Sequence, residues 1–207
     1  MSLTLNFELN DHDLAHFQAA AERSRKAAEG KSSEEVIAAA TALLDRAHNI
    51  AMPDFIKARL LRLDDMIAML RDEAWALADA DKQHVVSALT YFSDPGDIIP
   101  DDVPVLGFLD DAVMIELSMR DLAHELDAYD DFCDYRAREA KKRGIDPATL
   151  GRTEWLDGRR EELMERMHTR RDREQGFGYG YGRSSGYGLR GSGSYVRTWR
   201  PSSFKVS

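Results

Sequence analysis

Residues 93–111 read SDPGDIIPDDVPVLGFLDD, and this stretch decides how the elements on either side of it are connected. It contains three prolines and two glycines among six carboxylates. Each proline lacks an N–H donor and biases the residue before it away from the helical conformation, so an ordinary helix or strand is excluded. A solvated loop would have no use for the aliphatic residues that run through it, namely Ile98, Ile99, Val103, Val105 and Leu106. We therefore predict a buried elbow of fixed shape between two helices.

The polar positions of this elbow predict a structural role. Nine residues form the motif, namely Asp94, Pro95, Asp97, Pro100, Asp101, Pro104, Gly107, Asp110 and Asp111. Asp94 and Asp97 are suited to turns. Asp110 and Asp111 would lie in the first turn of the next helix, where the helix dipole favours negative charge.

The alternative for the elbow is a divalent-cation site. Hard cations bind several carboxylate oxygens held on irregular backbone, and the candidate ligands are Asp97, Asp101, Asp102, Asp110 and Asp111. The spacing is not that of an EF-hand, which needs alternate oxygen ligands and a terminal glutamate. Apart from this alternative cation, the sequence indicates no cofactor.

The elbow also resembles a known family. The pattern of residues 97–111, Asp-Ile-Ile-Pro-Asp-x-Val-Pro-Val-Leu-Gly-x-Leu-Asp-Asp, is similar to the signature of the YkvA-like family, a bacterial domain of unknown function. The resemblance extends over about residues 85–125 and implies no activity. Asp102 departs from the family pattern, which usually has an apolar residue there. Many relatives are hydrophobic enough to be predicted as membrane proteins.

Outward from the elbow, the sequence predicts an all-α bundle of about five to six helices. The expected segments are an N-terminal helix in residues 1–30, a helical core in 31–145, a further helical segment in 146–175 and a tail in 176–207. Asn10 or Asp11 is suited to cap the first helix and Gly30 to end it. Ser32 and Glu35 form a capping box, and Pro53 begins a helix with a clear apolar face.

After the elbow we expect one long helix, from about Phe108 to Arg143, that Gly144 ends. An apolar seam repeats along it at the spacing of a coiled coil, at Ile115, Met119, Leu122, Leu126, Tyr129 and Cys133. Such a seam does not remain in water. We expect it to pack on the helix that contains Ile56 and Leu70, or on a second copy of the chain.

The tail, residues 176–207, is rich in Gly, Tyr, Arg and Ser, and we expect it to be disordered and separable from the fold. Its Gly176–Gly182 run follows no strand and opens no helix, so it is not a nucleotide fingerprint. Nucleic-acid binding is disfavoured and would involve the tail alone, because the net charge of −9 divides into +5 on the tail and −14 on the remainder. Alternatively, the aromatic segment after Tyr195 docks on the domain or on a second chain.

Two other candidates have ordinary explanations. His12 and His16 lie one helical turn apart, as zinc ligands do, but no third ligand follows nearby. Cys133 stands among acids that would raise a thiol pKa, which disfavours a nucleophile. As the single cysteine, it excludes an internal disulfide and is typical of a reducing compartment.

These observations predict a cytoplasmic, non-enzymatic interaction or regulatory protein that binds a protein partner or itself. No export signal is visible, and acids interrupt the most apolar window, residues 103–119, so we expect no transmembrane segment. The first alternative is a metal-dependent enzyme, such as a hydrolase, that uses the elbow aspartates. The second is a protein associated with the membrane surface, which a body of charge −14 disfavours.

Overall fold

The computed structural model describes residues 10–27, 29–48, 50, 52–93, 99, 107–176, 199 and 201. The chain divides into two compact units. Unit 1 holds the described residues of Met1–Asp64 and Asp79–Asp121, and unit 2 holds Asp65–Ala78 and the described residues of Leu122–Ser203. We describe each unit by itself.

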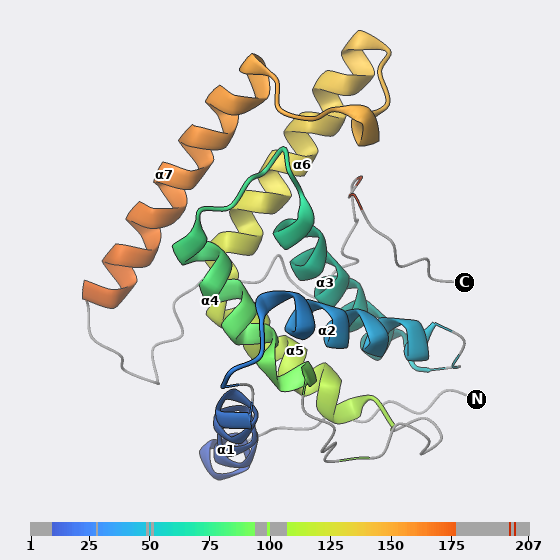
Figure 1. The fold of residues 1–207 in the computed structure, drawn as a ribbon, viewed down its shortest axis with the longest axis vertical. Helices are drawn as coiled ribbons and strands as arrows, with labels where there is room; N and C mark the ends of the chain where they lie inside the picture. Colours follow the sequence, from blue (N-terminus) through green and yellow to red (C-terminus); the bar gives the residue numbers. More distant parts are fainter. Residues whose placement is uncertain are drawn as a thin grey trace. The chain divides into compact units, whose positions relative to one another are not determined.

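The described residues form helices and no strands, which confirms the predicted all-α class. The described residues contain seven α-helices, and Figure 1 shows their arrangement within the ribbon. They are α1 (Asp11–Ala27), α2 (Ser33–Ala47), α3 (Asp54–Arg71), α4 (Asp79–Leu89), α5 (Leu109–Asp121), α6 (Ala123–Arg143) and α7 (Glu154–Gly176). Two short 3-10 helices, η1 (Thr90–Ser93) and η2 (Pro147–Thr149), accompany them.

The predicted single helix from Phe108 to Arg143 is wrong, because α5 and α6 are separate helices. Leu122, between them, has φ −101° and ψ 20°, outside the α-helical range. The boundary between the two units falls at the same residue. Within its own unit α5 packs with α4, whereas α6 packs with α7. Neither glycine nor proline marks the break, so only this difference of packing partners accounts for it.

The apolar seam predicted along that helix is nevertheless buried. Met119 is half-buried, and the other five positions are buried, namely Ile115, Leu122, Leu126, Tyr129 and Cys133. The periodicity therefore identified the inward side chains correctly although the helix is interrupted. Packing of the seam on the helix of Ile56 and Leu70, or on a second copy, remains a prediction.

The helix starts of unit 1 follow the local sequence. The Ser32 side chain accepts the N–H of Glu35, and the Glu35 carboxylate accepts the N–H of Ser32 at 2.7 Å, so the capping box is present. Hydrogen bonding to Ser32 lowers the pKa of Glu35. The Asn10 side chain accepts the N–H groups of His12 and Asp13 and caps α1. Pro53 stands one residue before α3, and its carbonyl accepts the N–H of Ile56.

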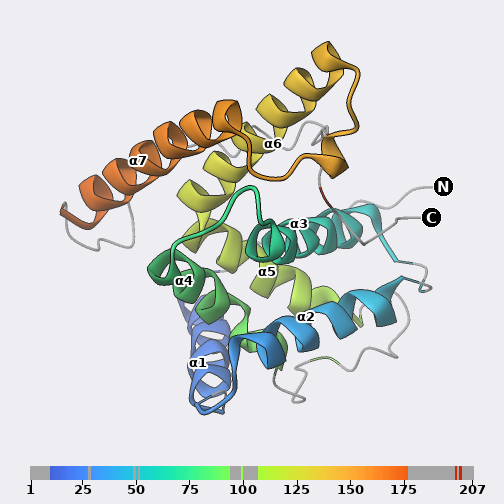
Figure 2. The same cartoon turned by 45° about the horizontal axis from the view of Figure 1, so that its top comes forward.

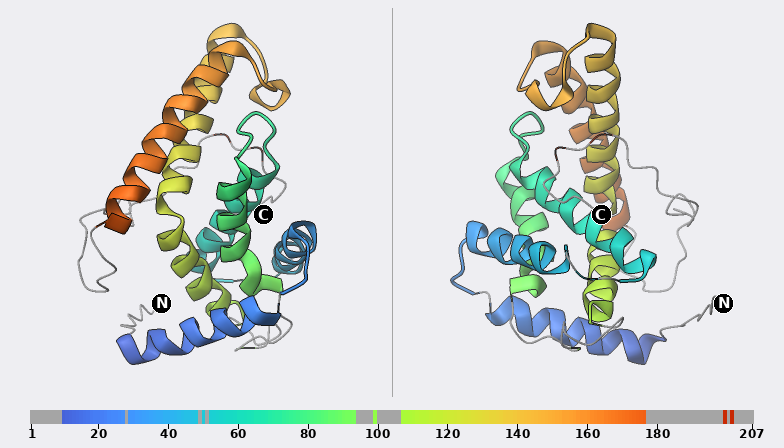
Figure 3. Two further views of the ribbon diagram at one scale, coloured as in Figure 1. Left: turned by 60° about the vertical axis from the view of Figure 1, so that its left-hand side comes forward. Right: turned by 90° about the vertical axis from the view of Figure 1, so that its right-hand side faces the viewer.

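The core of unit 1 forms around α2 and α4, which pack on each other and on η1. In Figure 3 the α1 helix (blue) lies against the η1 turn (green), with which it is in contact. Only Ala20 and Ser24 of α1 are buried. The Lys31 ammonium donates to the Ser93 carbonyl at 2.6 Å, which ties the start of α2 to η1.

Unit 2 contains an antiparallel pair of helices, α6 and α7, which run side by side in Figures 1 and 2. Gly144 ends α6 as predicted, with φ 66° and with its N–H and that of Ile145 bonded to Lys141 and Ala140. Ion pairs join the two helices at Glu125–Arg171, Asp127–Arg170 and Asp131–Arg166, and His124 Nε2 lies 3.0 Å from the Glu174 carboxylate. The partner numbers fall along one helix as they rise along the other, which fixes the antiparallel register.

None of the helices in the described ranges is long and apolar enough to cross a membrane. Most of the elbow and most of the tail lie outside the described residues. The prediction of a disordered tail concerns residues that are not described, so it stays a prediction. Trp199 and Pro201 are the tail residues that the structure describes beyond α7.

Candidate functional site

The buried polar cluster of unit 2 begins at the end of α3. Asp72 follows the last residue of that helix, and its Oδ1 atom accepts the N–H groups of Ala74 at 3.0 Å and Trp75 at 3.3 Å. The carbonyl of Asp72 accepts the N–H of Ala76 at 2.9 Å. An aspartate that bonds to the backbone two residues ahead forms an Asx turn, so the local sequence holds this bend in place.

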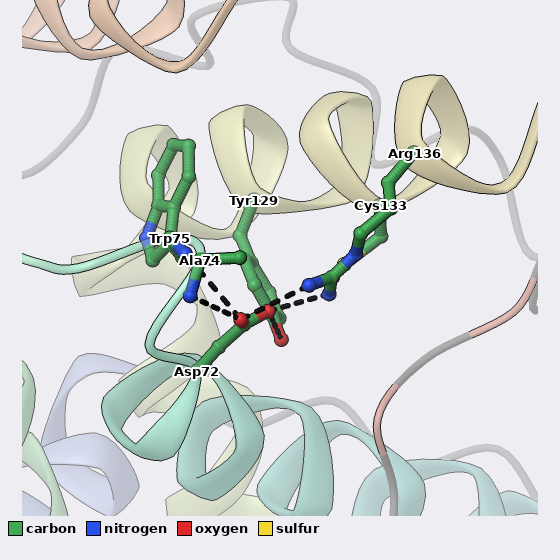
Figure 4. A network of polar contacts seen from close by, with 6 residues as sticks. All are labelled: Asp72, Ala74, Trp75, Tyr129, Cys133 and Arg136. Carbon is green, nitrogen blue, oxygen red and sulfur yellow. Dashed lines mark hydrogen bonds and ion pairs between the residues drawn. The ribbon is translucent and has the colours of Figure 1, made fainter. Parts of the chain in front are cut away.

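The same carboxylate receives two side chains from α6, as Figure 4 shows. Arg136 donates from Nη1 to Oδ1 at 3.1 Å and from Nη2 to Oδ2 at 2.5 Å. The Tyr129 hydroxyl donates to Oδ2 at 3.0 Å. The side chains of Arg136 and Asp72 are 3% and 5% exposed, so this bidentate pair is shielded from water. We call Asp72, Tyr129 and Arg136 the Asp72 network.

Electrostatics keep Tyr129 and Arg136 each in one protonation state. Burial raises the pKa of the Tyr129 hydroxyl far above its usual range, and neighbouring Cys133 and Asp72 raise it further. Burial alone would lower the pKa of Arg136, but the hydrogen bonds and charge of Asp72 outweigh it, and the pKa is raised. Tyr129 therefore stays a hydroxyl donor and Arg136 stays a cation at physiological pH.

Aromatic rings surround the network. The Trp75 ring lies 5.7 Å from that of Tyr129 and 5.0 Å from that of Phe132, between ring centroids. The Arg136 guanidinium carbon lies 5.2 Å from the Phe132 centroid. It also lies 4.6 Å from the ring centroid of Trp199, a residue of the tail. At this residue the tail contacts unit 2, as in the docking alternative that the sequence left open.

This arrangement is suited to holding groups in position and poorly suited to proton transfer. The Asp72 carboxylate accepts from two backbone N–H groups, two guanidinium nitrogens and one hydroxyl, which use the lone pairs that a general base would need. Arg136 is fixed by Asp72 and by two aromatic rings. Its guanidinium is thus a preorganised cation with a ring-binding face.

Sequence reasoning did not single out Asp72, Trp75 or Arg136. Asp72 and Arg136 are 64 positions apart, and no local motif links them. Tyr129 appeared only as a member of the apolar seam, and Cys133 appeared there and as a disfavoured nucleophile. Cys133 is buried and forms no disulfide, and Arg136 Nη2 lies 3.8 Å from its sulfur; its burial agrees with its place in the apolar seam.

The structure describes part of the predicted elbow site. Asp110 and Asp111 are buried in the first turn of α5, as the structural interpretation expects. The Oδ2 atom of Asp110 accepts the N–H of Ile99 at 3.0 Å, which joins the elbow to the helix that follows it. Gly107 is buried. The remaining motif positions lie outside the described residues, namely Asp94, Pro95, Asp97, Pro100, Asp101 and Pro104, and so does Asp102.

The predicted metal sites were also compared with the structure. In the ranges that it describes, no three His, Cys, Asp or Glu side chains are grouped so that they could hold an ion. His12 and His16 are both exposed, and their ring centroids are 5.1 Å apart. The cation site proposed for the elbow includes Asp97 and Asp101, which are not described, so it stays a prediction.

Comparison with known proteins places one short match at the elbow. Residues 84–117 match the model of a family described as a protein of unknown function, DUF1232. The matched stretch runs from α4 through η1 and the elbow into α5, so it belongs to unit 1. The chain is similar to this family over those residues. Neither a curated protein nor a solved structure matches the chain.

Proposed function

We propose that the chain is a non-enzymatic interaction protein in which unit 2 captures an aromatic chain segment on α6. The observation that supports this function is the Trp199 ring at 4.6 Å from the guanidinium carbon of Arg136. A long glycine-rich stretch of sequence separates Trp199 from the end of α7 at Gly176. The contact therefore joins α6 to a residue that is remote from it in sequence. We call the Arg136 guanidinium and the adjacent Phe132 ring the Arg136 surface.

The energetics favour capture by this surface. A cation over an aromatic face contributes about 0.5–1 kcal/mol at exposed sites and about 2 kcal/mol where it is desolvated. Arg136 is among the buried residues, so its contact belongs to the stronger class. Asp72 already fixes the guanidinium, and little side-chain entropy is therefore left to lose when a ring binds.

Catalysis is not the function that these side chains support. The Asp72 carboxylate is saturated with donors, Tyr129 is held as a neutral hydroxyl, and Arg136 is committed to Asp72. In unit 1, Asp110 commits Oδ2 to the Ile99 N–H, which supports a structural elbow. Calorimetric titration of Mg²⁺, Mn²⁺, Ca²⁺ and Zn²⁺ into the protein tests the metal-dependent alternative, and stoichiometric binding would revive it.

We further propose that residues 84–117 form a YkvA-like structural element and that the protein acts in the cytoplasm. The first statement rests on the Pro, Gly and Asp spacing of the elbow together with the family match. The second rests on the single, buried cysteine, which suits a reducing compartment. Capture of a partner by unit 2 needs neither a cofactor nor a membrane.

Fluorine NMR of the protein labelled with 5-fluorotryptophan tests the capture directly. The chain contains three tryptophans, and the signal of position 199 is assigned with Trp199→Phe. We expect Arg136→Gln to move that signal toward its position in a free peptide. Arg138→Gln, at an exposed arginine of the same helix, is the matched control and should leave it in place.

A second measurement needs no change at Arg136, whose loss leaves Asp72 unpaired and threatens folding. A soluble nitroxide broadens the signals of exposed side chains. In the wild-type protein the signal of Trp199 should broaden much less than the tryptophan signal of a peptide with the sequence of residues 195–203. Equal broadening of the two signals would show that Trp199 is not captured.

A further inference from the structure

The far end of the α6–α7 hairpin carries a basic surface that the proposed function does not use, and we propose that this surface binds single-stranded nucleic acid. Residues 137–160 hold seven bases and four acids, so this end of the hairpin is positive although the chain as a whole is negative. We call the following residues of unit 2 the hairpin-end surface, namely Tyr135, Arg138, Lys141, Lys142, Arg143, Arg152, Trp155 and Arg159.

Two aromatic rings of this surface lie against guanidinium groups. The guanidinium carbon of Arg143 is 4.2 Å from the ring centroid of Trp155, and that of Arg159 is 5.8 Å from the centroid of Tyr135. The two ring centroids are 6.2 Å apart, and both aromatic residues are half-buried. Nucleic-acid bases stack on aromatic rings and on guanidinium planes alike. The surface therefore offers stacking partners that packing holds in place.

The bases of the surface reach farther into solvent than the acids that hold them. The Glu139 carboxylate pairs with Lys142 at 2.6 Å and with Arg143 at 2.5 Å. Its side chain is 15% exposed, whereas those of Lys142 and Arg143 are 70% and 39% exposed. Hydrogen bonds from these two bases lower the pKa of Glu139, so the carboxylate stays ionised and holds both. Asp157, which is half-buried, pairs in the same way with the exposed Arg152 at 3.3 Å.

A phosphate chain that carries bases is the partner that fits both features. The five exposed bases can contact several phosphates of a strand, namely Arg138, Lys141, Lys142, Arg143 and Arg152. Two acids of residues 137–160 are exposed as well, but the Asp146 carboxylate is committed to the N–H of Ala148. An acidic peptide would use the positive charges and leave the rings unused. Single-stranded nucleic acid uses both.

The acids in the first half of α6 do not prevent this binding. Asp131 lies about 15 Å from Lys141 along the helix axis, at a rise of about 1.5 Å per residue. Salt at about 0.1 M screens exposed charges that are more than about 10 Å apart. The charge of the whole chain, which disfavours nucleic acid, is therefore not the charge that a strand meets at the hairpin-end surface.

The test uses the full chain and a fluorescein-labelled single strand of oligouridylate, long enough to cover the surface, in a fluorescence anisotropy titration. We expect a dissociation constant on the order of 10 µM at low salt. With about four phosphates contacted, a fourfold rise in salt should weaken binding by about fiftyfold. Absence of saturable binding up to about 0.1 mM protein would overturn the inference.

Paired substitutions locate the binding on the chain. Lys141→Gln with Lys142→Gln should weaken binding at least about tenfold, because both lysines are exposed and removable without loss of packing. Arg23→Gln with Lys26→Gln, at exposed positions of α1, changes the net charge equally and is the matched control. The control should keep the affinity of the wild type. Equal losses, or no loss from the lysine pair, would mean that the strand does not bind at the hairpin end, and the inference would be wrong.

A third comparison separates stacking from charge. Trp155→Leu should weaken binding of oligouridylate at least about fivefold, and Trp155→Phe, which keeps a ring, should restore most of it. An abasic strand of the same length should bind Trp155→Leu and the wild type equally. If a glutamate peptide of equal length displaces oligouridylate as readily as unlabelled oligouridylate does, the surface binds acidic protein segments and the nucleic-acid assignment fails.

Discussion

Unit 2 uses arginine–aspartate pairs in two regions, and the same chemistry has a different consequence in each. Asp72 and Arg136 are 5% and 3% exposed at their side chains and meet through two hydrogen bonds. Arg166 and Asp131, between α7 and α6, are 37% and 50% exposed. Water screens the second pair and scarcely reaches the first.

The two pairs differ in how much the fold depends on them. Removing one partner of a buried pair leaves an uncompensated charge in a low-dielectric interior. Removing one partner of an exposed pair leaves a charge that water solvates. Position, and not the residue types, therefore decides which pair matters for unit 2. The following substitutions test that difference, from the largest expected effect to the smallest.

Asp72→Ala should lower the free energy of unfolding by about 3–5 kcal/mol, because Arg136 remains buried without its counter-ion. Urea denaturation followed by circular dichroism, with hydrogen exchange of the α6 amides, measures the loss and assigns it to unit 2. The double variant Asp72→Leu, Arg136→Met removes both charges and should recover only part of the loss, because the N–H groups of Ala74 and Trp75 and the Tyr129 hydroxyl still lose their acceptor. A loss below about 1 kcal/mol for Asp72→Ala would mean that Asp72 and Arg136 stabilise unit 2 no more than an exposed ion pair does.

Leu163→Ala should cost about 2–4 kcal/mol, because Leu163 of α7 is 0% exposed and its removal leaves a cavity. The expected loss exceeds that from an exposed ion pair between α6 and α7 such as Arg166–Asp131, so apolar packing contributes more than that pair to holding α7 in place. Glu165→Ala, at an exposed position two residues along, is the control and should change the urea midpoint little. Equal effects of the two substitutions would mean that burial of Leu163 does not stabilise α7.

Ser32→Ala should cost about 1 kcal/mol through loss of the cap of α2 in unit 1. Hydrogen exchange of the α2 amides measures the loss locally. Hydrogen bonds from Ser32 lower the pKa of Glu35, so the folded state binds the proton of that carboxyl less well than the unfolded chain does. The Glu35 contribution is therefore present at neutral pH and is lost as the pH falls through the folded-state pKa. The difference between Ser32→Ala and the wild type should narrow in acid.

Arg166→Gln should cost only about 0.2–1 kcal/mol, since its pair with Asp131 is exposed. Thermal unfolding at low salt and at 1 M salt measures the effect, and high salt should abolish it. Asp72→Ala examined in the same two buffers should keep its effect. A salt-independent loss at Arg166 would break the distinction between the two regions.

Much of the local structure could be read from the sequence. The Ser32–Glu35 capping box, the Asn10 cap and the Gly144 stop are confirmed, because each depends on residues within four positions of one another. The apolar seam predicted which side chains are buried, since helical periodicity exists before any tertiary contact. The all-α class follows from the same signals.

Tertiary structure decided the rest. The break at Leu122 carries neither glycine nor proline and coincides with the boundary where packing partners change. Asp72 and Arg136 are paired across 64 positions, and an aspartate followed by a turn predicts no particular arginine. For the tail the sequence left docking of the aromatic segment open as an alternative to disorder, but it did not indicate Arg136 as the contact of Trp199. Local sequence determines caps and helix faces because their partners are neighbours in the chain, whereas burial of a charge depends on residues that only the folded chain brings together.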